Sequence, residues 1–292
     1  MGMSSMKEKT KEITSIKWLA PLSPRISGEV SPEDSLLKRA FFAISPVMIY
    51  VLYVGLLTQT AQIILVRIAD SREEYARYIS ANKTVINACI RTAVIAVATL
   101  AQIPALKGEK PVIISNDGKL ARYIRCICLG VFSALFVNVS LSLTGFTGSS
   151  ETYREVADRQ FALPLLLGIL LYGIVSPIAE EVIFRGLIYN RMRRNEMNIF
   201  PAMIISSALF GAYHFNIVQA VYGVLMGLLI VWVYERYGGF IYPVLFHASA
   251  NTAVYILSSA QVMGKIMTPV TVVVTGVMMV FVIVLIAREN KS

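Results

Sequence analysis

The chain has 292 residues and a formal net charge of +9, and 56% of its residues are apolar while only 15% are charged. Soluble domains carry about 25% charged residues, so this composition, with a mean hydropathy of +0.64, excludes an ordinary soluble protein. An excess of Lys and Arg is also typical of the cytoplasmic loops of membrane proteins, and no nucleic-acid partner is expected.

Charge-poor apolar stretches recur along the chain and predict an all-α polytopic membrane protein with about eight transmembrane helices. A helix needs roughly 20 mostly apolar residues to cross ~30 Å of hydrocarbon. Two stretches are unusual, because the second contains Arg91 and the fourth contains two acids and Arg185. The candidate spans cover residues 41–66, 84–106, 126–144, 161–189, 199–215, 217–234, 240–260 and 267–287.

These spans divide the chain into four predicted regions. Residues 1–40 form a polar tail, which is expected to be cytoplasmic and disordered, and the first span is expected to act as its own insertion signal. Residues 41–160 hold the first three helices and their loops, residues 161–260 hold a core with a polar cavity, and residues 261–292 hold the last helix.

The distribution of positive charge predicts the orientation of the spans. With eight spans both termini share one side of the membrane, and 18 of the 27 Lys and Arg residues lie on that side against 7 on the other. The positive-inside rule therefore predicts that both termini are cytoplasmic. The loop that contains Glu151, Glu155 and Asp158 is expected to be an exposed connector on the opposite side.

An adjacent pair of acids interrupts the fourth span. Nineteen uncharged residues lead to Glu180 and Glu181, and Arg185 follows four residues after Glu181. On a helix Glu181 and Arg185 can form an ion pair, whereas Glu180 is rotated by about 100° and has no basic residue three or four positions on. A carboxylate without such a partner in a poorly solvated place can accept a proton from water. The alternative is that both acids reach the cytoplasmic surface and pair with Arg185 and Arg191.

The chain has two histidines, and both lie in apolar stretches further along. Phe210 and His214 are four residues apart, as are His247 and Asn251, so each pair shares one helix face. A single polar residue on an apolar helix is usually a packing or hydrogen-bonding element, so neither pair is informative by itself.

The predicted depths of these polar residues agree with one another. If residues 195–198 form the turn of a helical hairpin, Glu180 and His214 lie equally far from its centre on opposite arms. At 1.5 Å per residue, Glu180, His214, His247 and Asn251 lie about 12 to 21 Å below the cytoplasmic surface. Acids and imidazoles at one depth on three helices can converge, and their presence in hydrocarbon indicates a functional site.

Three short motifs resemble those of the type II CAAX prenyl endopeptidases and their prokaryotic relatives, the CAAX proteases and bacteriocin-processing (CPBP) proteins, also called abortive-infection proteins. The family's motifs are two glutamates with an arginine after three intervening residues, phenylalanine with histidine four later, and histidine with asparagine or aspartate four later. The resemblance covers about residues 165–256, roughly a third of the chain. The matching residues are Glu180, Glu181 and Arg185; Phe210 and His214; and His247 and Asn251.

The resemblance implies an intramembrane endopeptidase, with the peptidase core in residues 161–260. Glu180 would activate a water molecule that His214 helps to hold, and His247 and Asn251 would donate hydrogen bonds to the tetrahedral oxyanion. A neutral imidazole and an amide are suitable donors for that task. The reaction would need no cofactor and no metal. The substrate would be a peptide or protein, which can be membrane-anchored or prenylated, at the plasma membrane of a prokaryote.

Other residues would support this site. Glu181 and Arg185 would orient their helix from behind the reacting groups, and Phe210 belongs to the same motif set. Asn216 and Gln219 are close to His214 in the sequence and are candidates to extend the polar network.

Three alternatives stay open. Zinc could be held by Glu180, His214 and His247, because catalytic zinc takes three protein ligands and a water, although the chain lacks His-Glu-x-x-His. A transporter would also place acids and histidines at mid-membrane, but the halves of the chain show no matching interrupted spans. A scaffold or immunity protein could retain the fold without catalysis, and Glu180→Gln would distinguish it.

Overall fold

A computed structural model of the protein describes residues 33–106 and 119–289, which form helices and turns and no strand. Within these ranges six helices are long and apolar enough to cross a membrane. The predicted all-α polytopic membrane fold is thereby confirmed. The six are α3 (Leu36–Ser71), α5 (Lys83–Leu106), α6 (Lys119–Leu143), the continuous helix Leu165–Arg194, α12 (Ile217–Tyr237) and α14 (Pro269–Arg288).

The two other predicted spans are helical but do not share these properties. The helix α11 (Ile199–Ala212) has 14 residues, too few to cross the hydrocarbon, and the chain turns after it. The helix α13 (Ile241–Ser259) has 19 residues but carries a polar set around His247. The predicted number of eight spans thus corresponds to six helices of spanning length and hydropathy and two further apolar helices in the described part of the chain.

The boundaries of the predicted tail and connectors differ from the structure. Most of residues 1–40 lies outside the described ranges, but α3 already begins at Leu36, where the side chain of Ser35 accepts a hydrogen bond from the Lys38 amide. Two connectors contain short helices, α4 (Glu73–Ala81) and α7 (Glu151–Phe161). The acids of α7 are exposed as expected, but its other face lines a cavity, so α7 is not a simple exposed connector.

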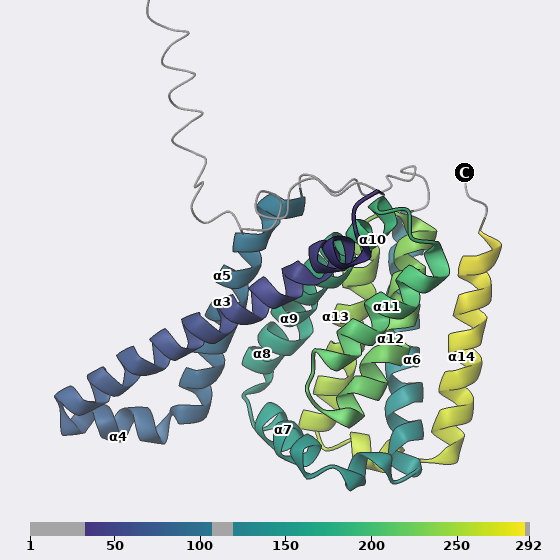
Figure 1. Ribbon diagram of the computed structural model, residues 1–292. Coiled ribbons are helices and arrows are strands. Elements are labelled where there is room, and N and C mark those ends of the chain that lie inside the picture. Colours follow the sequence, from purple (N-terminus) through teal and green to yellow (C-terminus); the bar gives the residue numbers. More distant parts are fainter. Residues whose placement is uncertain (1–32, 107–118, 290–292) are drawn as a thin grey trace, which may run out of the picture.

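The helices form two groups that diverge at one end (Figure 1). Helices α3 and α5 extend away from the rest and are joined by α4 at their far ends, while α6, α12, α13 and α14 pack side by side. The start of α3 and the end of α14 lie at the same end of the molecule. There Glu289, just after α14, accepts hydrogen bonds from Arg122 (2.6 Å), Arg125 and Tyr237 (3.0 Å), which ties α14 to α6 and α12.

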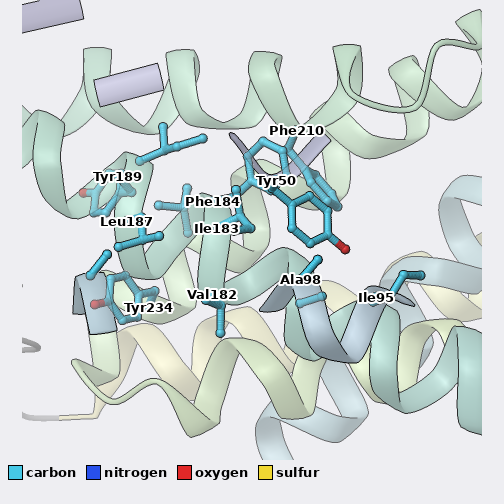
Figure 2. Close-up of a cluster of buried hydrophobic side chains, with 14 of the residues drawn as sticks. Tyr50, Ile95, Ala98, Val182, Ile183, Phe184, Leu187, Tyr189, Phe210 and Tyr234 are labelled. Atoms are coloured by element: carbon cyan, nitrogen blue, oxygen red, sulfur yellow. The ribbon is translucent and has the colours of Figure 1, made fainter. Parts of the chain in front are cut away.

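The continuous helix Leu165–Arg194 is the centre of the fold. It contains α8 (Leu165–Gly168), α9 (Ser176–Glu181), α10 (Asn190–Arg194) and two π-helical segments, η2 (Ile169–Val175) and η3 (Val182–Tyr189). Every residue of η3 is buried, because α3, α5 and α11 surround it. Figure 2 shows this core, in which Phe184 and Leu187 of η3 lie among side chains of the neighbouring helices.

The second hydrophobic cluster joins α6, α12, α13 and α14. The helices α6 and α13 approach so closely that a Cβ atom at Gly130 would lie 2.2 Å from the carbonyl oxygen of Phe246. Only glycine fits at this crossing, so the sequence of α6 sets the position of α13 and of the polar residues that follow Phe246.

Candidate functional site

A cavity of about 520 Å³ lies among the helices, within the size range of small-molecule and substrate sites. Glu180, His214, His247 and Asn251 all line it, together with residues of α3, α5, α6, α7 and α12. The structure therefore brings together in one cavity the four residues that the sequence analysis selected as catalytic.

Glu181 and Arg185 lie behind the cavity wall, with their side chains 0% exposed. The Arg185 Nη1 atom donates to Glu181 Oε1 at 3.0 Å, which confirms the predicted ion pair. The Nη2 atom donates to the Gly227 carbonyl at 3.2 Å, and the guanidinium carbon lies 4.7 Å from the centre of the Phe210 ring. Because desolvated charges are tolerated only with such partners, this pair fixes η3 against α11 and α12.

His247 lies between the two glutamates. Its Nδ1 atom is 2.8 Å from Glu181 Oε1, and its Nε2 atom is 3.5 Å from Glu180 Oε2. Glu180 has no basic neighbour on its own helix, as the sequence indicates, but it contacts a histidine of another helix. A carboxylate oxygen accepts hydrogen bonds, so the Nδ1–H group of His247 is the donor to Glu181, and the Nε2 atom faces Glu180. The Glu181 contact also fixes the orientation of the ring, as an acid does for a catalytic histidine.

His214 is held by its own helix. Its Nδ1 atom lies 2.9 Å from the carbonyl oxygen of Phe210, and since a carbonyl only accepts, the proton of a neutral ring is on Nδ1. The Nε2 atom is then free to accept a hydrogen bond from water in the cavity. The ring of Phe210 packs edge-on against His214 (5.2 Å between centroids) and His247 (5.5 Å), so it sets the separation of the two imidazoles.

The early end of α11 places His214 at depth. After this helix of about 21 Å the chain turns at residues 213–216 and returns as α12. Non-helical backbone at membrane depth is tolerated only where it is buried in protein or lines a water-filled cavity, and Tyr213, His214 and Phe215 line the cavity. Phe215 has a φ of +53°, a region that residues with a Cβ rarely adopt and that is enriched at functional sites.

Asn251 is positioned by the π-helical segment η2. Its Nδ2 atom donates to the carbonyl oxygen of Tyr172 at 3.1 Å. In η2 the backbone bonds run to the fifth residue, as from Ser176 to Leu171, and the corresponding residue for Tyr172 is Pro177, which has no N–H. The π register and the proline together leave this carbonyl available, and the second amide proton of Asn251 stays available for a ligand.

Several residues of the site were not selected from the sequence. Tyr50, Tyr172 and Tyr213 line the cavity, and periodicity does not distinguish such tyrosines from ordinary core residues. Arg91 also lines the cavity, and a charge within a predicted span is the sequence feature that indicates such a position. The two residues that were expected to extend the network separate: Gln219 lines the cavity, whereas the Asn216 side chain caps α12 by accepting from the amides of Val218 and Gln219.

Within the described residues, no group of three or more His, Cys, Asp or Glu side chains is arranged to share one metal ion. The nitrogens of His247 face two carboxylates, and the Nδ1 atom of His214 faces a backbone carbonyl. Among the ring nitrogens of this site, the Nε2 atom of His214 alone forms no hydrogen bond or ion pair with the described residues.

The fold and the site define a class: a polytopic helical membrane protein with a buried polar cavity that contains paired acids, two histidines and an asparagine. Residues 162–253 match the protein family described as Type II CAAX prenyl endopeptidase Rce1-like. This match includes every residue of the three motifs and confirms the predicted resemblance to that family of peptidases.

Three curated proteins are similar to part of the chain. A Bacillus subtilis (strain 168) protein named "Putative membrane peptidase YdiL" is 32% identical over 133 residues, which are 44% of this chain and 53% of that protein. The "UPF0177 protein YxdF" of Lactococcus lactis subsp. lactis (strain IL1403) is 30% identical over 112 residues, 38% of this chain and 56% of that protein. An "Uncharacterized 24.3 kDa protein" of Escherichia coli is 29% identical over 129 residues, 42% of this chain and 59% of that protein.

The chain thus spans between 53% and 59% of the length of these relatives. No solved structure matches the chain.

Proposed function

We propose that this protein is an intramembrane endopeptidase in which Glu180 acts as the general base. The observation that carries the proposal is the position of Glu180 in the lining of a cavity that it shares with His214, His247 and Asn251, with its Oε2 atom 3.5 Å from His247 Nε2. These are the group types that peptide hydrolysis needs: a proton acceptor for water and donors for the developing oxyanion.

In the proposed reaction, water lies between the Glu180 carboxylate and the Nε2 atom of His214. Glu180 takes a proton from the water as its oxygen attacks the scissile carbonyl carbon, and the negative charge moves to the carbonyl oxygen. An N–H group at Nε2 of His247 and the amide of Asn251 would then donate hydrogen bonds to the oxyanion. When the C–N bond breaks, Glu180 returns its proton to the leaving amine.

The remaining motif residues would keep these groups in place. Glu181 holds the His247 ring through Nδ1, and Arg185 holds the Glu181 carboxylate through its own hydrogen bond. Phe210 spaces the two imidazoles with its ring and fixes His214 with its carbonyl. None of these three contacts the proposed water, so all three are positioning residues.

Replacing Glu180 with Gln tests the proposal. The native protein and the variant, each purified in lipid nanodiscs, are given membrane-extracted peptides, and the cleavage products are identified by mass spectrometry. The peptides that accumulate in cells carrying either form are compared in the same way. Hydrolysis should fall by about 10² to 10⁴ in Glu180→Gln, the usual contribution of a general base. The control is Glu155→Gln, an exposed acid of α7 that pairs with Arg159. If both variants cleave like the native protein, or if a native biological function survives Glu180→Gln, a scaffold role replaces catalysis.

The same assay tests the proposed absence of a metal. Activity should persist in the presence of EDTA and 1,10-phenanthroline. Loss of activity with chelator and recovery with stoichiometric zinc would replace the proposal by a zinc mechanism with Glu180, His214 and His247 as ligands.

The proposal includes the setting of the reaction. The substrate is a peptide or protein, membrane-anchored or prenylated, that reaches the cavity from the bilayer, and no cofactor takes part. The membrane is the plasma membrane of a prokaryote, and both termini are cytoplasmic, as the distribution of Lys and Arg indicates.

A further inference from the structure

Arg91 of α5 lines the same cavity as Glu180, and the mechanism above does not use it. It is the one lysine or arginine among the described residues that line the cavity, and its side chain is exposed there. A charged side chain within a membrane span is costly unless it faces a polar cavity or a partner. The position of Arg91 within a membrane span therefore indicates that its charge has a partner or a function in the cavity.

Arg91 forms no ion pair within the described ranges, although Glu180 lines the same cavity. No carboxylate oxygen of the described residues lies within 4 Å of the Arg91 guanidinium, whose carbon lies 5.9 Å from the centre of the Tyr172 ring. The other arginines in the membrane core are engaged: Arg185 binds Glu181, and Arg191 donates to the Phe42 carbonyl at 2.9 Å and to Ser45 at 3.2 Å. Arg91 alone keeps its hydrogen-bond donors for something that enters the cavity.

Tyr172 connects this cation to the proposed oxyanion site. Its ring lies beside Arg91, and its carbonyl oxygen holds the Asn251 amide. Tyr172 precedes Glu180 by eight residues, which corresponds to about 12 Å along a helix. An extended peptide covers about 3.3 to 3.6 Å per residue, so about 12 Å between the levels of Glu180 and Tyr172 corresponds to three or four substrate residues.

We propose that Arg91 binds a carboxylate of the peptide substrate and thereby sets which bond reaches Glu180. This inference rests on the proposed peptidase function. A guanidinium offers paired N–H donors that match a carboxylate, and the contact is strong where water is partly excluded. Arg91 lies about 12 Å inside the start of α5 at Lys83 and faces the cavity, so a peptide group suits the site better than a lipid headgroup at the surface.

Binding without turnover tests this site. The Glu180→Gln protein in nanodiscs is titrated with two fluorescein-labelled apolar decapeptides that differ only in a C-terminal carboxylate or carboxamide. The carboxylate form should bind about 10- to 100-fold more tightly, as expected for hydrogen bonds to a charged group. Adding Arg91→Gln should abolish this preference, and Arg91→Lys should retain part of it. The matched control is Arg77→Gln, which removes an exposed arginine of α4 and should leave the preference intact.

A third peptide, with a carboxamide terminus and one internal aspartate, identifies the source of the carboxylate. Tight binding of this peptide assigns the site to acidic side chains, and weak binding assigns it to the free terminus. Equal affinities for the first two peptides, no binding of either, a preference that persists in Arg91→Gln, or loss of the preference on adding phosphatidylglycerol would overturn the proposal.

The two proposals fail separately. A protein that cleaves peptides through Glu180 but shows no carboxylate preference would refute the role of Arg91 alone. A protein that binds carboxylate peptides through Arg91 but cleaves none would refute the peptidase and leave the binding site. Because the first comparison changes the ligand rather than the protein, it stays informative even if the Arg91 variants do not fold.

Discussion

At the scale of single residues, the buried Glu181–Arg185 pair has a close counterpart on the surface. Both it and the Glu155–Arg159 pair of α7 join residues four apart at 3.0 Å. The first is fully buried, whereas Arg159 is 74% exposed. Equal geometry in two environments isolates the effect of desolvation.

We expect Arg185→Met to lower the free energy of unfolding by about 3 to 5 kcal/mol, because it leaves the Glu181 carboxylate buried without its cation. The loss should be smaller in the double variant Glu181→Gln/Arg185→Met, since no net charge is then buried. Arg159→Met should cost at most about 0.5 kcal/mol. Unfolding of each variant in mixed dodecylmaltoside and SDS micelles measures these values. If the loss of stability in the double variant equals the sum of the losses in Glu181→Gln and Arg185→Met alone, the two residues do not act as a buried pair.

The sequence predicted this pair because its spacing is local, but it did not predict the position of His247. The contact of His247 with both glutamates joins residues more than sixty positions apart, and no helical periodicity contains that information. Arg91 illustrates the same limit, because its charge was visible while its neighbours in the cavity depend on how α5 packs against η2.

At the scale of elements, α11 shows where apolar patterning fails. The apolar run predicted a span through residue 215, yet the helix ends at Ala212. Phe215 is apolar but 81% exposed with a positive φ, and Asn216 starts the next helix as its N-cap. Positions that line a cavity and positions that face lipid are both occupied by apolar residues, so hydropathy did not distinguish the turn from a continuing helix. The two π-helical segments were also not predicted, because their hydrogen-bond register leaves no simple sequence pattern.

The crossing of α6 and α13 leads to a prediction about helix packing. In Gly130→Ala the new methyl group would overlap the backbone oxygen of Phe246, which cannot rotate away. We expect a loss of about 1 to 3 kcal/mol in unfolding free energy. Because His247 follows Phe246 directly, peptide hydrolysis should also fall. Unfolding in mixed micelles and the cleavage assay measure the two effects.

The matched control for stability is Gly55→Ala in α3, where nothing lies within 4 Å of the new Cβ. Its stability should be unchanged or slightly higher, since alanine favours a helix over glycine by up to about 1 kcal/mol. If Gly130→Ala is as stable as Gly55→Ala, the helices α6 and α13 do not approach each other as closely as described.

At the scale of the whole molecule, the sequence predicted the membrane class, the hairpin turn at residues 195–198 and the shared cavity of four polar residues. It did so because hydropathy and the helix rise per residue constrain the membrane depth of each side chain, and polar side chains at one depth in a small helix bundle lie close together. It did not predict how α3 and α5 diverge from the other helices (Figure 1) or that α7 lines the cavity, since these depend on contacts between distant segments.

The same arrangement leads to a prediction about orientation in the membrane. Arg122, Arg125, Arg193 and Arg236 gather at the end of the molecule that carries the end of α14, while α4 lies at the opposite end (Figure 1). The positive-inside rule predicts that the arginine-rich end is cytoplasmic, because positive loops are retained there during insertion.

Cysteine labelling in intact cells checks this orientation. In a background without Cys89, Cys126 and Cys128, we expect Tyr78→Cys in α4 to react with a membrane-impermeant maleimide. Asn198→Cys, in the turn before α11, should react only after the membrane is permeabilised. Both positions are exposed in the fold, so a difference in labelling reports the side of the membrane. The reverse pattern would place Glu196 and the arginines of α10 outside the cell, and a substrate would then have to reach the cavity from the opposite side.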